Sequence, residues 1–357
     1  MFETSLCPEC GVPDYVTKEH LWLDNGDIVQ ARDKRHRICL IDCENLDPLF
    51  QGTADLIGMP IENIVITSSR RALRGYLKTF ISKEVTERVM RRELDINQLD
   101  EGFRALARPM GLGDYQYVDM RFEGDENDYF TVSITEPFSV PICAGGHAAA
   151  MEAILGYDHD VTYEEVAPNK YHMTAYPSIH HWGFKGRLNV DFYQHEEGDL
   201  ELEKCPTCGG PKALSAFKWY LDRGVIINQS VKRRSVLQGP LELDPVFQEL
   251  EAELGEDVIN VAVEAQRRFS KTGFYSMGDV STVEEFREVL AVRGLGNLKE
   301  LKISRSGLHM RLENAVLPVI IVGMMQGVYE AALGLDSDLD WEHGEDGTLT
   351  IEVTPRS

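Results

Sequence analysis

A five-residue cysteine motif occurs twice in this chain and shows the distance at which the sequence repeats. Cys7-Pro-Glu-Cys10-Gly11 reappears as Cys205-Pro-Thr-Cys208-Gly209, an offset of 205 − 7 = 198. The segment Trp22-Leu23-Asp24 returns as Tyr220-Leu221-Asp222 at the same offset. Repetition over such a long period predicts two structural units that descend from one module.

Further motif pairs follow in the same order, and the offset between them only shrinks, to 334 − 156 = 178 at the last pair. These pairs are Leu46-Asp47-Pro48 with Leu243-Asp244-Pro245, Arg70-Arg71 with Arg267-Arg268, Gly111-Leu112-Gly113 with Gly294-Leu295-Gly296, and Leu155-Gly156 with Leu333-Gly334. Chance similarity does not produce collinear matches of this kind. The sequence therefore predicts a tandem duplication, with one copy from about Cys7 to Pro177 and the other from Cys205 to Pro355.

Each copy is predicted to consist of a zinc-knuckle segment followed by an α/β module. The segments are residues 1–45 and 205–242, the modules are 46–177 and 243–357, and a linker of residues 178–204 joins the copies. Apolar alternation at 189–194 and 199–203 predicts that this linker is an ordered hairpin. The residue pairs Asp47-Pro48 and Asp244-Pro245 are expected to begin a helix, with aspartate as the N-cap.

Hydrophobic periodicity predicts the order helix, helix, strand, strand, helix, strand, strand within each module. In the first copy the helices are expected at 64–80, 98–107 and 140–155, and the strands at 116–122, 129–135, 161–165 and 172–176. This order indicates an α+β fold, with two copies of an antiparallel sheet and helices packed on one face of each.

The strongly negative net charge argues against two classes of binding partner, nucleic acids and anionic membranes. The chain of 357 residues carries a net charge of -23, whereas a protein that binds nucleic acid needs basic surface against phosphates. An anionic membrane leaflet would repel the same surface.

The chain begins with no basic segment followed by an apolar run, so we expect no secretory signal and a cytoplasmic protein. In a reducing compartment, Cys-x-x-Cys pairs favour metal or redox sites over disulfides.

The two cysteine pairs are candidate ligands of structural zinc. Tetrahedral zinc takes four ligands, and each copy supplies one pair, Cys7 with Cys10 and Cys205 with Cys208. The pairs either meet in one shared site or find local partners, such as Cys39 and Cys43 in the first copy. The second copy has Val236 and Gly239 near the latter positions, so we favour the shared site. A redox role is a further alternative, although proline and glycine around the thiols favour a knuckle.

Histidines and aromatic residues of the first copy are candidate ligand-binding residues. They are His147 in the small-residue helix, Tyr171 and His172 in the last strand, and Trp182, which follows His180 and His181. The second copy has Met325 or Gln326 near the position of His147, which predicts that the two copies differ in function. Arg70, in the repeated arginine pair, is a candidate for holding a ligand carboxylate, and the alternative is a structural role in an interface ion pair or on a helix surface.

The second part of each copy resembles the 4-vinyl-reductase-type domain, a small-molecule-binding module. In the first copy the resemblance lies in Ala144-Gly145-Gly146, followed by Met151-Glu152 and Leu155-Gly156, and in the strands that end at Glu165 and Tyr176. The resemblance implies a pocket between sheet and helices for a small, largely apolar molecule, and a pseudo-twofold pairing of domains. Many members bind zinc through cysteines in these last strands, but residues 165–176 and 342–353 contain none, so that zinc site is expected to be absent.

These features together predict a zinc-stabilised binding protein for a small hydrophobic or aromatic ligand. It would act as a sensor, carrier or accessory subunit, with a protein partner or a second copy of itself. One alternative is a metal- or cofactor-dependent, reductase-like enzyme with its site in the first copy. Another is a structural adaptor without a ligand.

Overall fold

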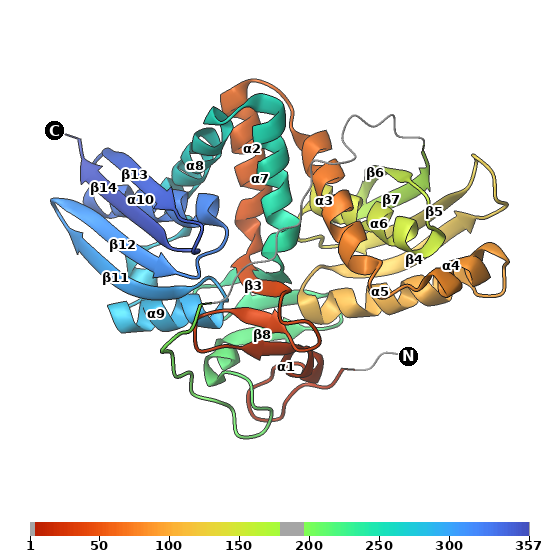
Figure 1. Cartoon of the computed structure of the whole chain (residues 1–357), viewed down its shortest axis with the longest axis horizontal. Helices are drawn as coiled ribbons and strands as arrows, with labels where there is room; N and C mark the ends of the chain where they lie inside the picture. The colour runs from red at the N-terminus through yellow and green to blue at the C-terminus, as the bar shows by residue number, and fades with distance from the viewer. Residues whose placement is uncertain (1–3, 179–195, 357) are drawn as a thin grey trace.

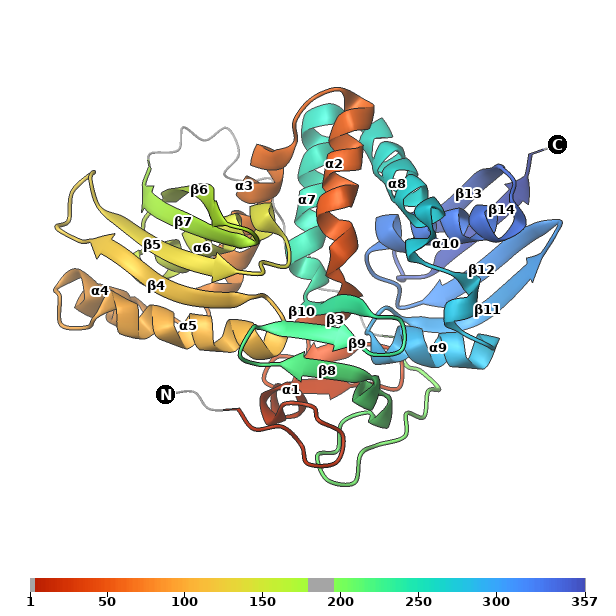
Figure 2. The ribbon, with the colours of Figure 1, turned by 180° about the vertical axis from the view of Figure 1, so that it is seen from behind.

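The computed structural model describes residues 4–178 and 196–356 of the chain. A central sheet lies between two lobes, and two long helices, α2 (Leu46–Ile57) and α7 (Pro240–Leu254), stand side by side above it (Figure 1 and Figure 2). Three antiparallel sheets with helices packed against them confirm the predicted α+β class.

Three strands from each half form the central sheet, in the order β1-β2-β3-β10-β9-β8. Their bounds are β1 His20–Trp22, β2 Ile28–Gln30, β3 Arg37–Asp42, β8 Phe217–Tyr220, β9 Val225–Asn228 and β10 Arg233–Gln238. β3 and β10 pair at the centre, where Leu40 lies opposite Leu237. A residue of β3 and its repeat equivalent in β10 differ by 237 − 40 = 197 in number. Under this equivalence the pair Ile41–Val236 becomes the pair Gln238–Cys39, which is also present in the sheet. The register is therefore symmetric about an approximate twofold axis.

The two lobes have the same order of elements, except that the first has an additional α-helix, Lys83–Met90. The first contains α3 (Glu62–Leu77), α4 (Lys83–Met90), α5 (Ile96–Met110), β4 (Asp114–Arg121), β5 (Tyr129–Thr135), α6 (Val140–Leu155), β6 (His159–Ala167) and β7 (Lys170–Pro177). The second contains α8 (Asp257–Phe269), α9 (Val283–Val292), β11 (Asn297–Ser304), β12 (Gly307–Glu313), α10 (Pro318–Leu333), β13 (Ser337–His343) and β14 (Leu349–Pro355). Their sheets run β4-β5-β7-β6 and β11-β12-β14-β13, which is one strand order used twice.

The remaining helical segments of the described residues are short. They are α1 (Asp14–Glu19) and the single turns Cys43–Asn45, Lys212–Ala216, Ser270–Phe274 and Met277–Asp279.

The two central helices are exchanged between the halves. Helix α2 packs against α8 of the second lobe, and α7 packs against α3 of the first lobe. The rings of Phe50 and Phe247, one on each helix, lie 6.5 Å apart. The boundaries predicted at residues 46 and 243 therefore do not separate compact units, because each lobe is completed by a helix from the other half.

Small residues in the helix between the two strand pairs of each lobe permit close packing against the first helix of that lobe. A Cβ atom on Gly145 of α6 would lie 2.4 Å from the Ile66 carbonyl oxygen of α3. A Cβ on Gly323 of α10 would lie 2.5 Å from the Val263 carbonyl oxygen of α8. Glycine is required at both positions because a larger residue would push the helices apart.

Two arginines at equivalent positions join each half to the other. In β3, Arg37 donates to the carbonyl oxygens of Gly294 and Asn314. In β10, Arg234 donates to the equivalent carbonyl oxygens of the first half, those of Gly111 and Glu136, at 3.3 and 2.6 Å. This reciprocal arrangement is what two intertwined copies of one module would produce.

Two local predictions were wrong. Helix α2 begins at Leu46 and α7 at Pro240, so Asp47 and Asp244 lie inside the helices and neither is an N-cap. The second helix starts earlier because Pro240, with its fixed φ, occupies the first turn. Residues 199–203 form no strand. Asp199 instead contacts Lys299, Asn297 and Arg287 of the second lobe, while the other expected linker strand, 189–194, lies outside the described residues.

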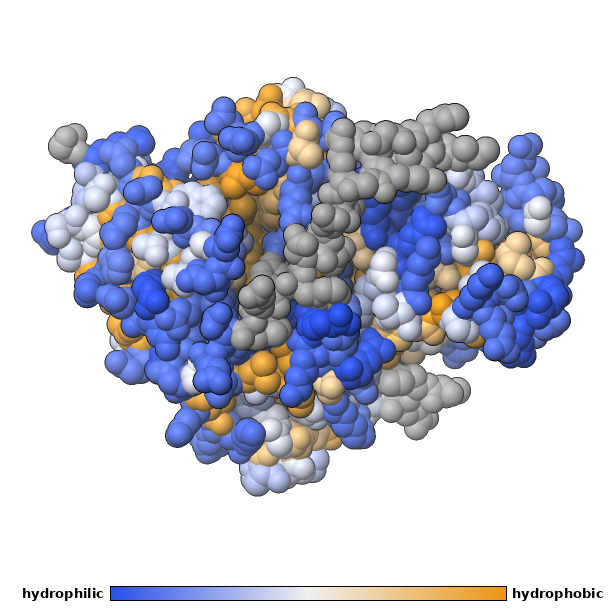
Figure 3. Space-filling view, viewed as in Figure 1, coloured by the Kyte–Doolittle hydropathy of each residue, from blue (hydrophilic) through white to orange (hydrophobic). Residues whose placement is uncertain are grey.

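The surface fits the strongly charged composition. Hydrophilic residues cover most of the face in Figure 3, and hydrophobic residues occur there in small separate groups. Within residues 4–178 and 196–356, no helix is both long and apolar enough to cross a membrane.

Candidate metal centre and internal cavity

Each cysteine motif folds into a tight knuckle closed by backbone hydrogen bonds. The Gly11 amide donates to the Cys7 carbonyl at 2.9 Å, and the Gly209 amide donates to the Cys205 carbonyl at 2.8 Å. Gly11 and Gly209 have φ of 74° and 76°, a conformation that glycine adopts without strain. The repeated glycine is thus explained by the turn that presents two thiols on one side.

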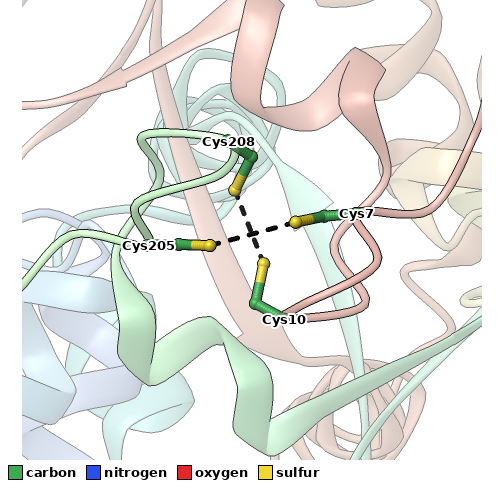
Figure 4. A group of neighbouring side chains, drawn as sticks. All are labelled: Cys7, Cys10, Cys205 and Cys208. Atoms are coloured by element: carbon green, nitrogen blue, oxygen red, sulfur yellow. Dashed lines mark hydrogen bonds between the residues drawn. The ribbon is translucent and has the colours of Figure 1, made fainter.

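The two knuckles face each other and bring four thiols together, as Figure 4 shows. The Sγ atoms of Cys7 and Cys205 lie 3.9 Å apart, and those of Cys10 and Cys208 lie 3.5 Å apart. All four Sγ atoms lie within 4.8 Å of one another, and none forms a disulfide. Tetrahedral zinc with Zn–S bonds of about 2.3 Å would separate its sulfur ligands by about 3.8 Å. The four thiols could therefore hold one metal ion between the halves.

The environment of the four thiols favours binding of a cation. The pKa of Cys7 is lowered to about 7, mainly because the Cys10 backbone amide donates a hydrogen bond to its sulfur. Burial raises the pKa of Cys10 and of Cys208, so these groups resist ionisation without a compensating positive charge. A metal ion would supply that charge. Thr207 also donates a hydrogen bond of 2.7 Å to Glu9 across the two knuckles.

The alternative local ligands lie elsewhere. The Cys39 thiol donates to the Gly294 carbonyl at 3.3 Å, and the Cys43 thiol to the Arg234 carbonyl at 3.7 Å. Both are buried, and burial raises the pKa of each. They lie in the interface between the halves and do not belong to the four-thiol cluster.

A cavity of about 170 Å³, partly open to solvent, lies between the first lobe and the central sheet. Its lining comes from α1, α3, α5 and α6, from β1, β2, β3, β4 and β10, from the start of α7 and from adjoining loops. The aromatic members of the lining are Tyr15, Tyr76, Phe80, Phe103, Tyr115 and Phe138. Most of the surface that lines the cavity is apolar, although polar and charged residues also contribute, so the cavity suits an apolar or aromatic guest.

Two buried histidines contribute to the lining of the cavity. His147 is 4% exposed, and its Nε2 lies 3.0 Å from the Phe130 carbonyl oxygen, which makes this nitrogen the donor. His20 makes the equivalent contact through Nδ1 with the Val16 carbonyl oxygen at 3.0 Å. Burial lowers the pKa of each to about 4, so both rings are neutral at pH 7.

Glu242 is the residue of the lining that sequence reasoning missed. Burial raises its pKa to about 7, and its Oε2 atom has no hydrogen-bond partner. It enters the first-half cavity from α7 of the second half. No motif surrounds it, and only the exchange of helices brings it there.

At two equivalent positions the second half has a buried ion pair. Aligned by the repeat, Met110 and Gly239 of the cavity lining correspond to Arg293 and Asp42. Those two residues form a buried ion pair with a distance of 3.0 Å between Arg293 Nη1 and Asp42 Oδ1. Arg233 adds a second contact to Asp42 at 3.6 Å. The halves thus differ in polarity at these positions.

The predicted ligand-binding residues do not form one site. Of these residues, His147 lines the cavity. Tyr171 lines a separate open groove, and His172 lines neither of these two spaces. Trp182, with His180 and His181, lies outside the described residues.

Arg70 is part of a structural contact that both halves share. Its Nη1 donates to the His159 carbonyl oxygen, and its Nε lies 3.8 Å from Glu152. Glu152 in turn accepts a hydrogen bond from the His159 amide at 2.9 Å. In the second lobe, Arg267 pairs in the same way with Glu330, the equivalent of Glu152. The repeated arginine thus fixes the helix to the next strand and does not reach the cavity.

Comparison of the chain with protein-family models, curated proteins and solved structures found no match. The candidate function is therefore argued from the geometry of the thiol cluster and the cavity.

Proposed function

We propose that this protein is a zinc-stabilised binding protein for a small hydrophobic or aromatic molecule, which occupies the cavity of the first half. The observation that carries the proposal is the apolar cavity of about 170 Å³ at positions that the second half fills with an ion-pair cluster. Filling such a space with side chains would stabilise the folded protein, because the residues around an empty cavity lose van der Waals contacts. A cavity kept in only one half therefore favours a ligand-binding role.

The size of the cavity limits the ligand to about one ring. An engineered apolar cavity of about 150 Å³ in another protein stays dry and binds benzene. Pockets for drug-sized ligands are larger, about 300–1,000 Å³. We therefore propose a ligand with a single aromatic ring or a short apolar body. The resemblance to the 4-vinyl-reductase-type domain supports the same class of ligand.

Zinc is the metal that the four-thiol cluster fits best. Four thiolates in tetrahedral arrangement are typical of structural zinc, and a closed set of four protein ligands leaves no position for substrate. We propose that Cys7, Cys10, Cys205 and Cys208 bind one zinc ion, which fastens the two halves together.

A cytoplasmic sensor, carrier or accessory subunit fits the remaining features. None of the seven cysteines forms a disulfide, as is typical in a reducing compartment. The net charge of -23 disfavours nucleic acid as a partner. An output would then pass through a protein partner or a second copy of this chain.

A substitution that fills the cavity tests the proposed function. Ala150 lines the cavity on α6, and Ala150→Leu is expected to weaken binding of phenol, a neutral probe with one aromatic ring, by at least about tenfold. Isothermal titration calorimetry measures this affinity. The control is Val328→Leu at the equivalent position of α10, which should leave the affinity unchanged. Failure of the wild-type protein to bind phenol, or equal binding by Ala150→Leu, would overturn the proposal.

A further inference from the structure

One buried oxygen on the cavity wall has no partner. Several buried polar side-chain atoms of the described residues lack a hydrogen bond, and Glu242 Oε2 is the one that belongs to the cavity lining. Leaving a buried carboxylate oxygen unpaired is unfavourable, and the penalty is greater for the ionised form. A positively charged guest held against the Glu242 carboxylate in the cavity would offset this penalty.

The two arginines of the cavity lining, Arg32 and Arg104, already interact with other groups. Arg104 Nε lies 2.6 Å from Asp100 Oδ2. Arg32 donates to Gln30 and Tyr76 at 3.2 and 2.9 Å, and its guanidinium lies 3.6 Å from the centre of the Phe80 ring. Because both arginines make these contacts, neither pairs with Glu242.

The electrostatics of Glu242 indicate that no cation faces it among the described residues. Burial is the largest influence on its pKa, and the contacts that oppose burial are hydrogen bonds at the backbone of Gly239 and of Glu242 itself. Neither Arg32 nor Arg104 contributes to the pKa shift of Glu242. The carboxylate therefore lacks a cationic partner, and it belongs to a lining rich in aromatic rings.

We infer that the cavity accepts a small aromatic cation, an arylalkyl ammonium, whose N–H group donates to the Glu242 carboxylate while its ring packs against the aromatic lining. The inference rests on the proposed function and specifies the ligand class of the same cavity. An ammonium group also has Coulomb attraction to the ionised carboxylate, which is stronger in a site of low dielectric constant than in water and favours ammonium over a neutral hydroxyl. Aromatic faces close to an ammonium group add a cation–π attraction.

Three probes of one shape test the ligand class. Benzylammonium, benzyl alcohol and benzoate are titrated calorimetrically into the full-length protein at about pH 8, above the pKa of about 7 of Glu242. We expect benzylammonium to bind at least about tenfold more tightly than benzyl alcohol, and benzoate more weakly than either. This comparison uses the wild-type protein alone and needs no variant.

A pair of variants then assigns the preference to one carboxylate. Glu242→Gln is expected to abolish the preference for benzylammonium and to keep the affinity for benzyl alcohol within about threefold of the wild-type value. Glu251→Gln removes the same charge from an exposed position of α7 and should preserve the preference.

The outcomes separate this inference from the proposed function. If phenol and benzyl alcohol bind but benzylammonium binds no more tightly, the cation inference is overturned and the binding function stands. If Glu242→Gln retains the preference, the assignment to Glu242 is overturned. If no probe binds the wild-type protein, both proposals fall.

Discussion

Replacing Cys205 and Cys208 together by serine is expected to release the bound metal and to lower the free energy of unfolding by on the order of 5 kcal/mol. Structural zinc contributes about 10–16 kcal/mol in isolated zinc-finger peptides, which do not fold without it. Here each knuckle also packs on the central sheet through its own apolar residues, such as Val12 and Leu214, so part of the fold survives. Denaturant unfolding of both proteins measures the difference.

The control is the double variant Cys39→Ser and Cys43→Ser. It makes the same chemical change at two buried thiols outside the cluster, and serine can still donate to the carbonyl oxygens that these thiols contact. We expect a loss of less than about 2 kcal/mol and full retention of metal. Metal loss from this control would show that the local cysteines are ligands after all.

Arg37→Met is expected to destabilise the protein by about 3–5 kcal/mol. The side chain of Arg37 is 1% exposed, and its ion-pair partner Asp27 is 0% exposed, so the substitution leaves a buried carboxylate without its cation. It also removes the donor to the Gly294 and Asn314 carbonyls, which joins the first half to the second. The free energy of unfolding from denaturant titration gives the comparison.

The equivalent arginine provides a matched control. Arg234 makes the corresponding carbonyl contacts from β10, but no ion pair with a buried carboxylate is found for it among the described residues. Arg234→Met should therefore cost less, about 1–3 kcal/mol. Equal losses from the two variants would mean that the Asp27 pair contributes little, contrary to our account.

Much of the secondary structure could be predicted from local patterns. The helix expected at 140–155 and the strand expected at 129–135 match α6 and β5 in both bounds, because uniform apolar character and β-branched residues mark them. The shared four-thiol cluster was also favoured, since four ligands were needed and each half supplied two. Helix starts were less accurate, because proline can occupy either the first turn or, as at Pro245, a later position.

The exchange of α2 and α7 could not be predicted from sequence. A repeat shows which segments are equivalent but not whether a helix packs within its own copy or against the other. For that reason Glu242 was missed as a neighbour of His147, although both line one cavity. Arg70 was misplaced for a related reason, since a buried arginine can face a ligand or, as here, a structural carboxylate such as Glu152.

Metal content per chain, measured by elemental analysis of the protein as purified, tests most directly whether the two halves share one metal site. We predict about one zinc ion per chain in the wild-type protein and none in the Cys205→Ser, Cys208→Ser variant, because all four thiols are needed for one site. Two metal ions per chain, or one that remains after both substitutions, would contradict a single shared site.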